Sequence, residues 1–526
     1  MMPSRIRLLV VLALLCAEFP AWSSVEALPV ALSVNTSSGP VTGFEQDGIL
    51  EFRGIRYAQP PVGPLRWAAP QPSDRHAGQV DSPAVSCPQN APSVFARPSV
   101  SEDCLVLNIF IPHSTEAGSV HRKARWPVIV WLHGGGLFSG SGADYDGGRL
   151  AREGHVVVVT LNYRLGALGF LSEPATTADS GGVANFGLLD QQLALRWIKR
   201  NVESFGGLPS AVTLAGQSSG ATSVVAHLTA PGSAGLFQRA VIESGTRFTP
   251  LSNERARAAA DSFAASVGCK DNTLRCLRNL SVQTILDHQQ NVVSVTAANF
   301  FLLDRVTGPE PPLEAIGAGH FTRVPVISGL TADEQAYFLP EASTGQPLSA
   351  ADYSNWVSAT GGSRATQIVT RYPANHYGSP SLAEIAAAQD AKRCVVLRLD
   401  RSLARFVPVY AYEFADRSAP SYFTERSYPM GAYHTAELQY LFPLFHGARG
   451  TIHALNPSQD ALARQMIGWW SEFARAGAPG TRGTPWRAFQ PDSNTVQVIG
   501  ADIAAHHDIE SAYANACGFW DSLGAQ

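Results

Sequence analysis

A serine flanked by glycines is the residue with the clearest chemical potential in this chain. The segment Gly216-Gln217-Ser218-Ser219-Gly220 follows a short apolar run at residues 212–214 and precedes residues 221–228, which favour a helix. On a tight turn between a strand and a helix, a serine presents its hydroxyl as a nucleophile, and the flanking glycines let the two elements approach. The same pattern also arises by chance in glycine-rich chains. Its place between a strand and a helix favours a nucleophilic role for Ser218.

A second glycine-rich segment, His133-Gly134-Gly135-Gly136, follows the apolar run at residues 127–132. Backbone N–H groups in such a loop can converge on one point and stabilise the negative charge that an oxygen acquires during acyl transfer. A phosphate-binding loop would continue with Lys and then Ser or Thr, whereas Leu137-Phe138 follow here. We therefore interpret the segment as an oxyanion hole rather than a phosphate site or an ordinary flexible loop.

A serine hydroxyl is a weak nucleophile unless a base accepts its proton and an acidic side chain orients that base. Where the serine lies between a strand and a helix of a parallel sheet, the acid and then a histidine follow it in the chain. The residues after Ser218 include many carboxylates and several histidines, among them His320, His434 and His446. Composition and spacing do not choose between these candidates.

Alternating strand and helix signals surround these segments. Near-continuous apolar runs, typical of strands buried on both faces of a parallel sheet, lie at residues 127–132, 156–161, 212–214, 240–242, 324–327 and 409–412. Residues 190–204 and 459–476 favour amphipathic helices, each followed by glycine. The alternation predicts an α/β fold with a large, mostly parallel central sheet flanked by helices. Helical segments within about 250–325 and 345–405 are expected to form excursions over the active site.

Composition and charge exclude several classes of protein. Of the 526 residues, 45% are hydrophobic and 16% are charged, so a core can be buried and global disorder is excluded. The formal net charge of −4 and the lack of a basic run argue against nucleic acid as a partner. The length alone suggests two or three domains, but a large α/β sheet can carry long insertions. We expect residues 28–526 to form one domain.

The N-terminus has the layout of a secretory signal peptide. Arg5 and Arg7 precede an apolar run at residues 8–17, and Val25-Glu26-Ala27 is an acceptable cleavage site. The run is about ten residues long, whereas a helix needs roughly 20 to span a bilayer. We expect residues 1–27 to be removed, the protein to be secreted or periplasmic, and no segment to span a membrane.

The cysteine count agrees with export. Removal of Cys16 with the signal peptide would leave six of the seven cysteines, and an even number in an exported chain favours disulfides. Six cysteines allow fifteen pairings, so the spacing alone does not fix the pairs. No cysteine spacing is typical of a zinc site.

Several segments together make the chain similar to the type B carboxylesterases, the family that includes the cholinesterases. The resemblance runs from about residue 41 to residue 520. Its motifs are residues 57–63 (YAQPPVG), 102–109 (EDCLVLNI), 162–166 (NYRLG), 185–192 (NFGLLDQQ) and the serine segment 205–220 (FGGLPSAVTLAGQSSG). These segments occur in the order that the family has, which makes the resemblance specific.

The resemblance implies an α/β-hydrolase fold with a catalytic triad of Ser218, Glu334 and His434. Glu334 lies in the segment Ala332-Asp333-Glu334-Gln335 and His434 in residues 431–437 (GAYHTAE), which are similar to the stretches that hold the family's acid and base. Oxyanion donors would be the backbone N–H groups of Gly135, Gly136 and Ser219. The implied disulfides are Cys87–Cys104, Cys269–Cys276 and Cys394–Cys517, and neither a metal nor an organic cofactor is implied.

The expected function is that of a serine carboxylesterase acting on small, neutral carboxylic esters. Choline esters are disfavoured, because the Cys87–Cys104 loop has no tryptophan to bind a quaternary ammonium and Gln217 replaces the family's usual glutamate beside the nucleophile. Alternatives of the same fold are a lipase, a polyester hydrolase or an amidase. Some relatives are adhesion proteins that have lost the triad, but this chain keeps all three residues, which argues against a purely binding role.

Overall fold

An eleven-stranded sheet forms the centre of the molecule. The computed structural model describes residues 32–75, 78–79, 85–90, 94–112, 125–173, 181–269, 273–339, 341, 345–480, 486–491, 496–500 and 510–523. The strands of the sheet are β1 (Leu32–Thr36), β2 (Gly39–Gln46), β3 (Ile49–Arg56), β4 (Val106–Pro112), β5 (Trp126–Leu132), β6 (Val157–Leu161), β7 (Gly207–Gln217), β8 (Arg239–Glu243), β11 (Val326–Thr331), β12 (Val409–Phe414) and β13 (Gln497–Ile499). Their order in space is β1-β2-β3-β4-β6-β5-β7-β8-β11-β12-β13.

The sheet confirms the mostly parallel arrangement. All pairs from β6 to β13 are parallel, whereas β1 to β4 and the β4–β6 pair are antiparallel. The apolar runs predicted from sequence form β5, β6, β7, β8, β11 and β12. Because every residue of β6, β11 and β12 is buried, these strands need apolar side chains on both faces. Two further short strands, β9 (Pro250–Leu251) and β10 (Phe300–Leu302), pair with each other outside this sheet.

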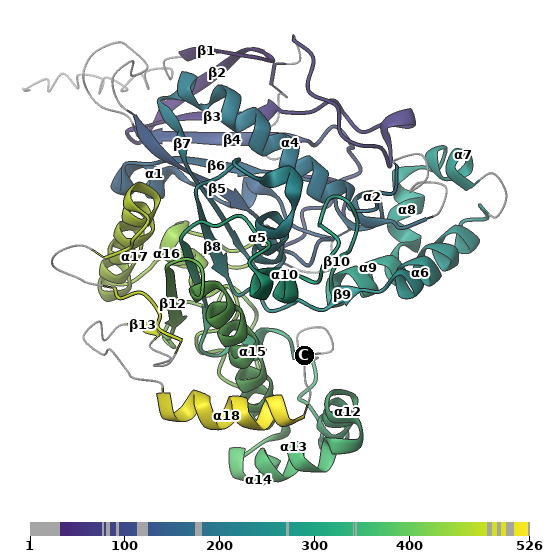
Figure 1. Cartoon of the computed structure of the whole chain (residues 1–526), viewed down its shortest axis with the longest axis vertical. Coiled ribbons are helices and arrows are strands. Elements are labelled where there is room, and N and C mark those ends of the chain that lie inside the picture. Colours follow the sequence, from purple (N-terminus) through teal and green to yellow (C-terminus); the bar gives the residue numbers. More distant parts are fainter. Residues whose placement is uncertain are drawn as a thin grey trace, which may run out of the picture.

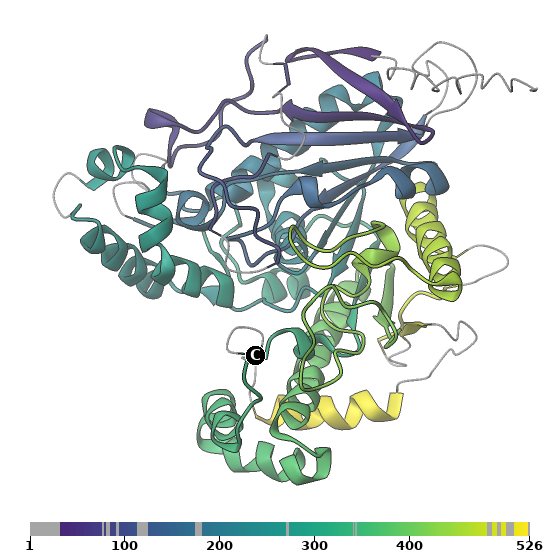
Figure 2. The same cartoon turned by 180° about the vertical axis from the view of Figure 1, so that it is seen from behind.

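Helices cover both faces of the sheet (Figures 1 and 2). Their bounds are α1 (Gly148–Gly154), α2 (Gly166–Phe170), α4 (Phe186–Asn201), α5 (Ser219–Thr229), α6 (Asn253–Ser266), α7 (Thr273–Arg278), α8 (Val282–His288), α9 (Gln290–Ala298), α10 (Pro312–Ala318), α12 (Ala350–Gly361), α13 (Ala365–Arg371), α14 (Ala374–Tyr377), α15 (Pro380–Ala404), α16 (Leu438–Leu441), α17 (Pro457–Ala476) and α18 (Glu510–Ser522). Helices α5 and α15 pack directly on strands, as do α1 and α17.

Local sequence explains where the long helices begin and end. Ser379 caps α15 by accepting from the N–H of Leu382, and Asn456 and Gln459 form a reciprocal capping box at the start of α17. Gly477 ends α17 in a left-handed conformation with φ of 78°. The predicted helix at 190–204 is corrected at both ends, because α4 begins at Phe186 and residues after Asn201 form a 3-10 turn.

The expected helical excursions are present as α6 to α10 and as α12 to α15. In Figure 1 α6 to α9 lie to the right of the sheet, α10 lies near the centre beside α5, and α12 to α14 lie at the bottom beside α18. Three disulfides link Cys87 to Cys104, Cys269 to Cys276 and Cys394 to Cys517, the pairs that the resemblance implies. The last joins α15 to α18 across 123 residues of sequence, and closing such a loop contributes roughly 4–5 kcal/mol in the chain-entropy description.

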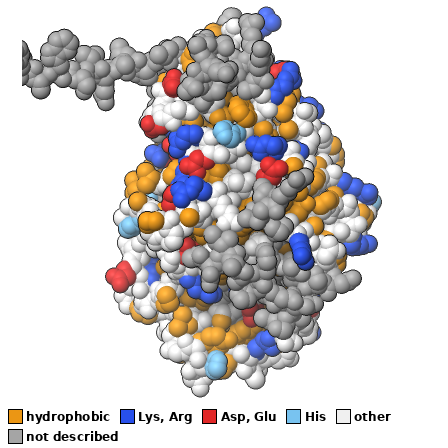
Figure 3. All heavy atoms as spheres, turned by 90° about the vertical axis from the view of Figure 1, so that its left-hand side faces the viewer, with side chains coloured by type: hydrophobic (Ala, Val, Ile, Leu, Met, Phe, Trp, Pro, Cys, Tyr) orange, Lys and Arg blue, Asp and Glu red, His pale blue; other side chains and the backbone are white. Residues whose placement is uncertain are grey.

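The surface agrees with the near-neutral composition. On the face drawn in Figure 3, basic and acidic side chains alternate with apolar and uncharged ones. Within the residues that the structure describes, no helix is both long and apolar enough to cross a membrane. The predicted signal peptide at residues 1–27 lies outside the described residues.

Candidate functional site

Ser218 lies on the sharp turn between β7 and α5, as the sequence predicts. Its backbone has φ of 58° and ψ of −124°, a conformation that residues other than glycine rarely adopt. The turn is fixed by the main chain: the N–H of Ser218 donates to the carbonyl of Glu243 on β8 at 2.8 Å, and its carbonyl accepts from the N–H of Thr222 at 3.0 Å. A strained backbone persists where the surrounding structure imposes it, and here the two hydrogen bonds hold Ser218 at the edge of the sheet.

The flanking glycines are required by contact rather than by flexibility. A Cβ atom at Gly220 would lie 2.0 Å from the carbonyl oxygen of Leu132, and one at Gly216 would lie 2.6 Å from the main chain of Gly220. Both distances are shorter than real Cβ contacts. The spacing of glycine, serine and glycine therefore records how tightly β5, β7 and α5 pack around the turn.

The glycine loop after β5 runs directly against the serine. A Cβ atom at Gly134 would lie 3.1 Å from the Cβ of Ser218, and Gly135 and Gly136 have positive φ angles of 105° and 65°. No hydrogen bond joins the N–H groups of Gly135 or Gly136 to another described residue. Ser219 is the first residue of α5, where N–H groups have no acceptor within the helix. All three N–H groups are therefore available to a bound oxygen.

Polar residues from two other segments hold this loop in place. Gln89 brackets Gly140 with two hydrogen bonds of 2.9 Å, and Tyr163 donates to the carbonyl of His133 at 2.8 Å while stacking on its ring. Burial lowers the pKa of His133 to about 4, against a hydrogen bond to Gly134 that raises it. His133 is consequently a neutral, structural residue near neutral pH.

Glu334 and His434 come together from separate loops at the same edge of the sheet. Glu334 begins a short 3-10 helix, η5 (Glu334–Tyr337), just after β11, and its carboxylate faces Nδ1 of His434. The same carboxylate accepts from the hydroxyl of Ser244 and, at 3.0 Å, from the N–H of Thr331. Glu334 and His434 are both buried. The carboxylate therefore fixes the orientation of the ring and the position of its Nδ1 proton.

The loops of the two residues are tied to each other. The N–H of Asp333 donates to the carbonyl of Ala432, and the N–H of Ala432 donates to the Asp333 carboxylate, each at 2.9 Å. Asp333 also pairs with Arg417 at 2.8 Å. The acidic residue next to Glu334 therefore joins the two loops instead of contacting the histidine.

Gln217 occupies the space between the serine and the histidine. Its amide Nε2 lies 3.3 Å from Nε2 of His434, and its side chain is buried. Among the described residues, no hydrogen bond joins the Ser218 hydroxyl to His434. The structure thus brings the predicted base and nucleophile to one cavity without a direct hydrogen bond, an arrangement common in sites without substrate.

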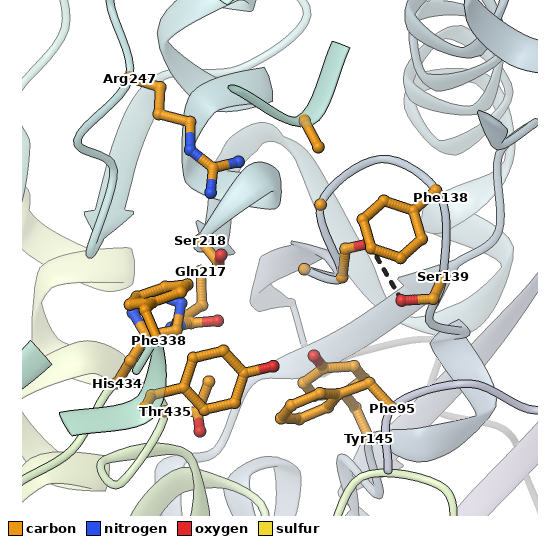
Figure 4. Close-up of a pocket in the computed structure, with 15 residues that line it drawn as sticks. Phe95, Phe138, Ser139, Tyr145, Gln217, Ser218, Arg247, Phe338, His434 and Thr435 are labelled. Carbon is orange, nitrogen blue, oxygen red and sulfur yellow. Dashed lines mark hydrogen bonds between the residues drawn. The ribbon is translucent and has the colours of Figure 1, made fainter. Parts of the chain in front are cut away.

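Ser218 and His434 line one cavity of about 310 Å³ (Figure 4). Glycines 134 to 136 form one wall of this cavity. The others are largely aromatic, with Phe95, Phe138, Tyr145, Tyr337 and Phe338 among the lining residues. His320 and His446, the other histidines considered, do not line it: His320 pairs with Glu310, and His446 contacts the carbonyl of Leu444. Of the three candidates, only His434 meets the serine.

Two charged groups behind the cavity respond to burial in opposite ways. Burial by itself raises the pKa of Glu334, but His434, Lys392 and the Ser244 hydroxyl together lower this pKa to about 2. Burial lowers the pKa of Lys392 on α15 to about 8, against the influence of Glu334. The Lys392 ammonium lies 4.0 Å from the centre of the Phe338 ring and donates to Gln335 at 2.9 Å. Glu334 is therefore ionised at every pH at which the protein would act.

Sequence reasoning missed the supporting residues. Gln89, Ser244 and Lys392 belong to none of the quoted motifs, and no short-range pattern marks them. Tyr163 lies inside the segment 162–166, where its role was not assigned. Only their contacts in the folded chain identify them.

Comparison with known proteins adds an independent line of observation. The sequence model of a family described as "Carboxylesterase family" matches residues 30–520. Para-nitrobenzyl esterase of Bacillus subtilis (strain 168) is 31% identical over 508 residues, which cover 91% of this chain and 96% of that protein. Pyrethroid hydrolase Ces2e of Rattus norvegicus is 32% identical over 506 residues, covering 88% and 85%. A solved structure of a PNB esterase matches with a TM-score of 0.75 at 29% identity, covering 92% of this chain and 99% of that one.

Proposed function

Because the chain belongs to the carboxylesterase family, we propose that it hydrolyses carboxylic esters through an acyl-enzyme intermediate on Ser218. It is a carboxylic ester hydrolase with the α/β-hydrolase fold. One observation carries the proposed role of Ser218: Ser218 and His434 line the same cavity, with a glycine loop against the serine and an ionised carboxylate behind the histidine.

In the first half of the reaction, the Ser218 hydroxyl attacks the ester carbonyl while Nε2 of His434 accepts its proton. The carbonyl oxygen becomes negatively charged and is held by the N–H groups of Gly135, Gly136 and Ser219. Glu334 stabilises the imidazolium that forms. His434 then protonates the leaving alcohol, and the acyl group remains on Ser218.

In the second half, water takes the place of the alcohol. His434 accepts a proton from this water, which attacks the acyl-enzyme, and the oxyanion hole again stabilises the charge. Return of the proton to Ser218 releases the acid. The Gln217 amide must move or turn for Nε2 of His434 to reach the serine, since the two nitrogens lie 3.3 Å apart in the structure.

We also propose that the enzyme acts outside the cytoplasm, after cleavage of residues 1–27, as a single domain of residues 28–526. The three disulfides support this proposal because disulfides persist in oxidising compartments. Secretion and a periplasmic location are equally compatible with these disulfides.

Covalent labelling tests the role of Ser218. An organophosphonate that carries a para-nitrophenol leaving group should inactivate the enzyme and release one equivalent of nitrophenol per protein molecule. Peptide mapping by mass spectrometry should locate the phosphonyl group on Ser218. Neighbouring Ser219 is the internal control, because its hydroxyl accepts a hydrogen bond from the N–H of Leu137. Label on Ser219, or full inactivation without label on Ser218, would contradict the assignment.

The dependence of activity on pH tests the base. The value of kcat/KM should fall on the acid side with one ionisation, because a protonated His434 cannot accept the serine proton. Glu334 adds no second ionisation, since its pKa of about 2 keeps it charged. The pKa of Glu334 is lower in the folded protein than in the unfolded chain, so its ionised form stabilises the fold at pH values above the unfolded pKa. This stabilisation is lost as the pH falls through the folded-state pKa of about 2. Initial rates with para-nitrophenyl butyrate from about pH 4 to about pH 9 provide the measurement, and a flat profile would argue against a histidine base.

A further inference from the structure

Arg247 brings a positive charge into the catalytic cavity. It follows β8 in the chain and is one of the residues that line the cavity with Ser218. Figure 4 shows its guanidinium on the same side of the cavity as Ser218, pointing towards the serine. Among the described residues that line this cavity, Arg247 and His434 alone have side chains that can be charged at neutral pH, and none is a carboxylate.

The guanidinium lacks the partner that the buried arginines of this chain have. Arg66 pairs with Glu102, and Arg164 pairs with Asp190. In the part of the chain that the structure describes, no hydrogen bond or ion pair joins Arg247 to another residue. Burial lowers the pKa of Arg247 from its usual value, against the influence of Tyr337, but arginine remains protonated in proteins. A partly desolvated cation without a partner is costly, and an anionic ligand would remove that cost.

Neighbouring residues preserve this positive potential. Gln217, beside the nucleophile, is neutral, and a carboxylate at this position would offset the charge of Arg247 across the cavity. Behind the Phe338 ring, the Lys392 ammonium adds a second positive charge. The carboxylate of Glu334 faces His434 instead of the cavity. The site therefore repels cationic substrates and attracts anionic ones.

We propose that Arg247 binds a carboxylate carried by the substrate, so that the enzyme prefers an ester with one free, ionised carboxyl group over its neutral isostere. This inference rests on the proposed role of Ser218. It changes the expected substrates from neutral esters to esters that carry one carboxylate. A guanidinium matches a carboxylate with two parallel N–H donors, which fixes orientation as well as charge. The ester carbonyl would then lie between this anchor and the oxyanion hole.

The carboxylate could belong to either half of the ester, as in a half-ester of a dicarboxylic acid or an ester of a hydroxy acid. Arg247 also borders a second cavity of about 490 Å³, whose lining includes Arg398 and two carboxylates, Glu314 and Asp521. Because these carboxylates would repel an anion, the substrate's carboxylate is expected on the Ser218 side of Arg247.

Two pairs of substrates test the proposal. In the acyl pair, the mono-para-nitrophenyl ester of adipic acid is compared with the ester in which an isopropyl group replaces the terminal carboxylate. In the alcohol pair, the butyrate ester of para-hydroxybenzoate is compared with that of para-isopropylphenol. Each pair gives one number, the ratio of kcat/KM for the anionic ester to that for the neutral ester. Spontaneous hydrolysis is subtracted in each case.

Arg247→Met should lower this ratio roughly ten- to hundredfold in at least one pair, which is the range for hydrogen bonds to charged groups. Arg247→Lys should keep part of the preference, because it keeps the charge without the fork of donors. Arg398→Met is the matched control, since it removes the same charge from the second cavity, where Arg398 pairs with Asp521; its ratio should equal that of the wild type. The pair that responds identifies the half of the ester that carries the anion.

Ionic strength provides a measurement without any variant. Added salt screens charges, so the ratio for the wild type should fall as salt rises while the rate with the neutral ester changes little. Equal ratios for the wild type and Arg247→Met in both pairs, with no effect of salt, would overturn the proposal even though neutral esters are hydrolysed. Failure to hydrolyse any ester would instead contradict the proposed function, so the two failures are distinguishable.

Discussion

Ser218→Ala should reduce kcat for para-nitrophenyl butyrate by at least about 10⁴-fold, since removal of a triad serine leaves only the catalysis supplied by binding and the oxyanion hole. The fold should be retained, because Ser218 is held by hydrogen bonds of its main chain to Glu243 and Thr222, which alanine can also make. Rates of purified protein, with circular dichroism and thermal unfolding beside them, provide the measurement.

Ser219→Ala is the control for this variant. We expect it to keep activity within about tenfold of the wild type, because alanine retains the backbone N–H that would serve the oxyanion. Removing the Ser219 hydroxyl would remove the hydrogen bond that it accepts from the N–H of Leu137 at 3.3 Å. A Ser218→Ala protein that keeps a tenth of the wild-type rate would refute the nucleophile assignment.

Glu334→Gln should lower kcat by roughly 10³- to 10⁴-fold, as expected when the acid of a triad becomes an amide. The amide oxygen can still accept from Ser244 and Thr331, so the loop should keep its shape. The amide NH₂ would then face Nδ1 of His434. It would favour the tautomer with the proton on Nε2, which cannot accept the serine proton.

Asp333→Asn tests whether the neighbouring carboxylate, instead of Glu334, is the acid of the site. Asp333 pairs with Arg417 and the main chain of Ala432, so its amide variant should cost stability more than rate. We expect less than about a tenfold loss of kcat together with a lower unfolding temperature. If Asp333→Asn were inactive and Glu334→Gln active, the acid of the site would be Asp333.

Much of the central sheet could be predicted from sequence, for a physical reason. Strands buried on both faces, such as β5 and β6, must be apolar at nearly every position, so they are visible as runs. The antiparallel strands β1 and β2 were not predicted, because they alternate between exposed and buried residues over a short length. A strand with one wet face resembles a polar loop when only the sequence is read.

The residues of the candidate site differ in how far the sequence alone could identify them. Ser218 and the glycine loop lie in local motifs, so their roles could be proposed from the residues themselves. Glu334 and His434 were chosen only by resemblance to a family, because their proximity depends on β11 and β12 ending at one edge of the sheet. Arg247 has no sequence signal: a single arginine after a strand is ordinary until its surroundings are known.

The assembly of the site from distant segments also determines when the protein can be active. Gly135, Ser218, Glu334 and His434 follow β5, β7, β11 and β12, and parallel neighbours must be joined by crossover connections. Pairing between strands far apart in the sequence is slow, because the chain loses loop-closure entropy before the stabilising contacts form. In an incomplete or unfolded chain that lacks β12, the proposed nucleophile would have no base. Esterase activity is thus a late product of folding, and a chain exported unfolded would stay inert until it reaches the compartment where it folds.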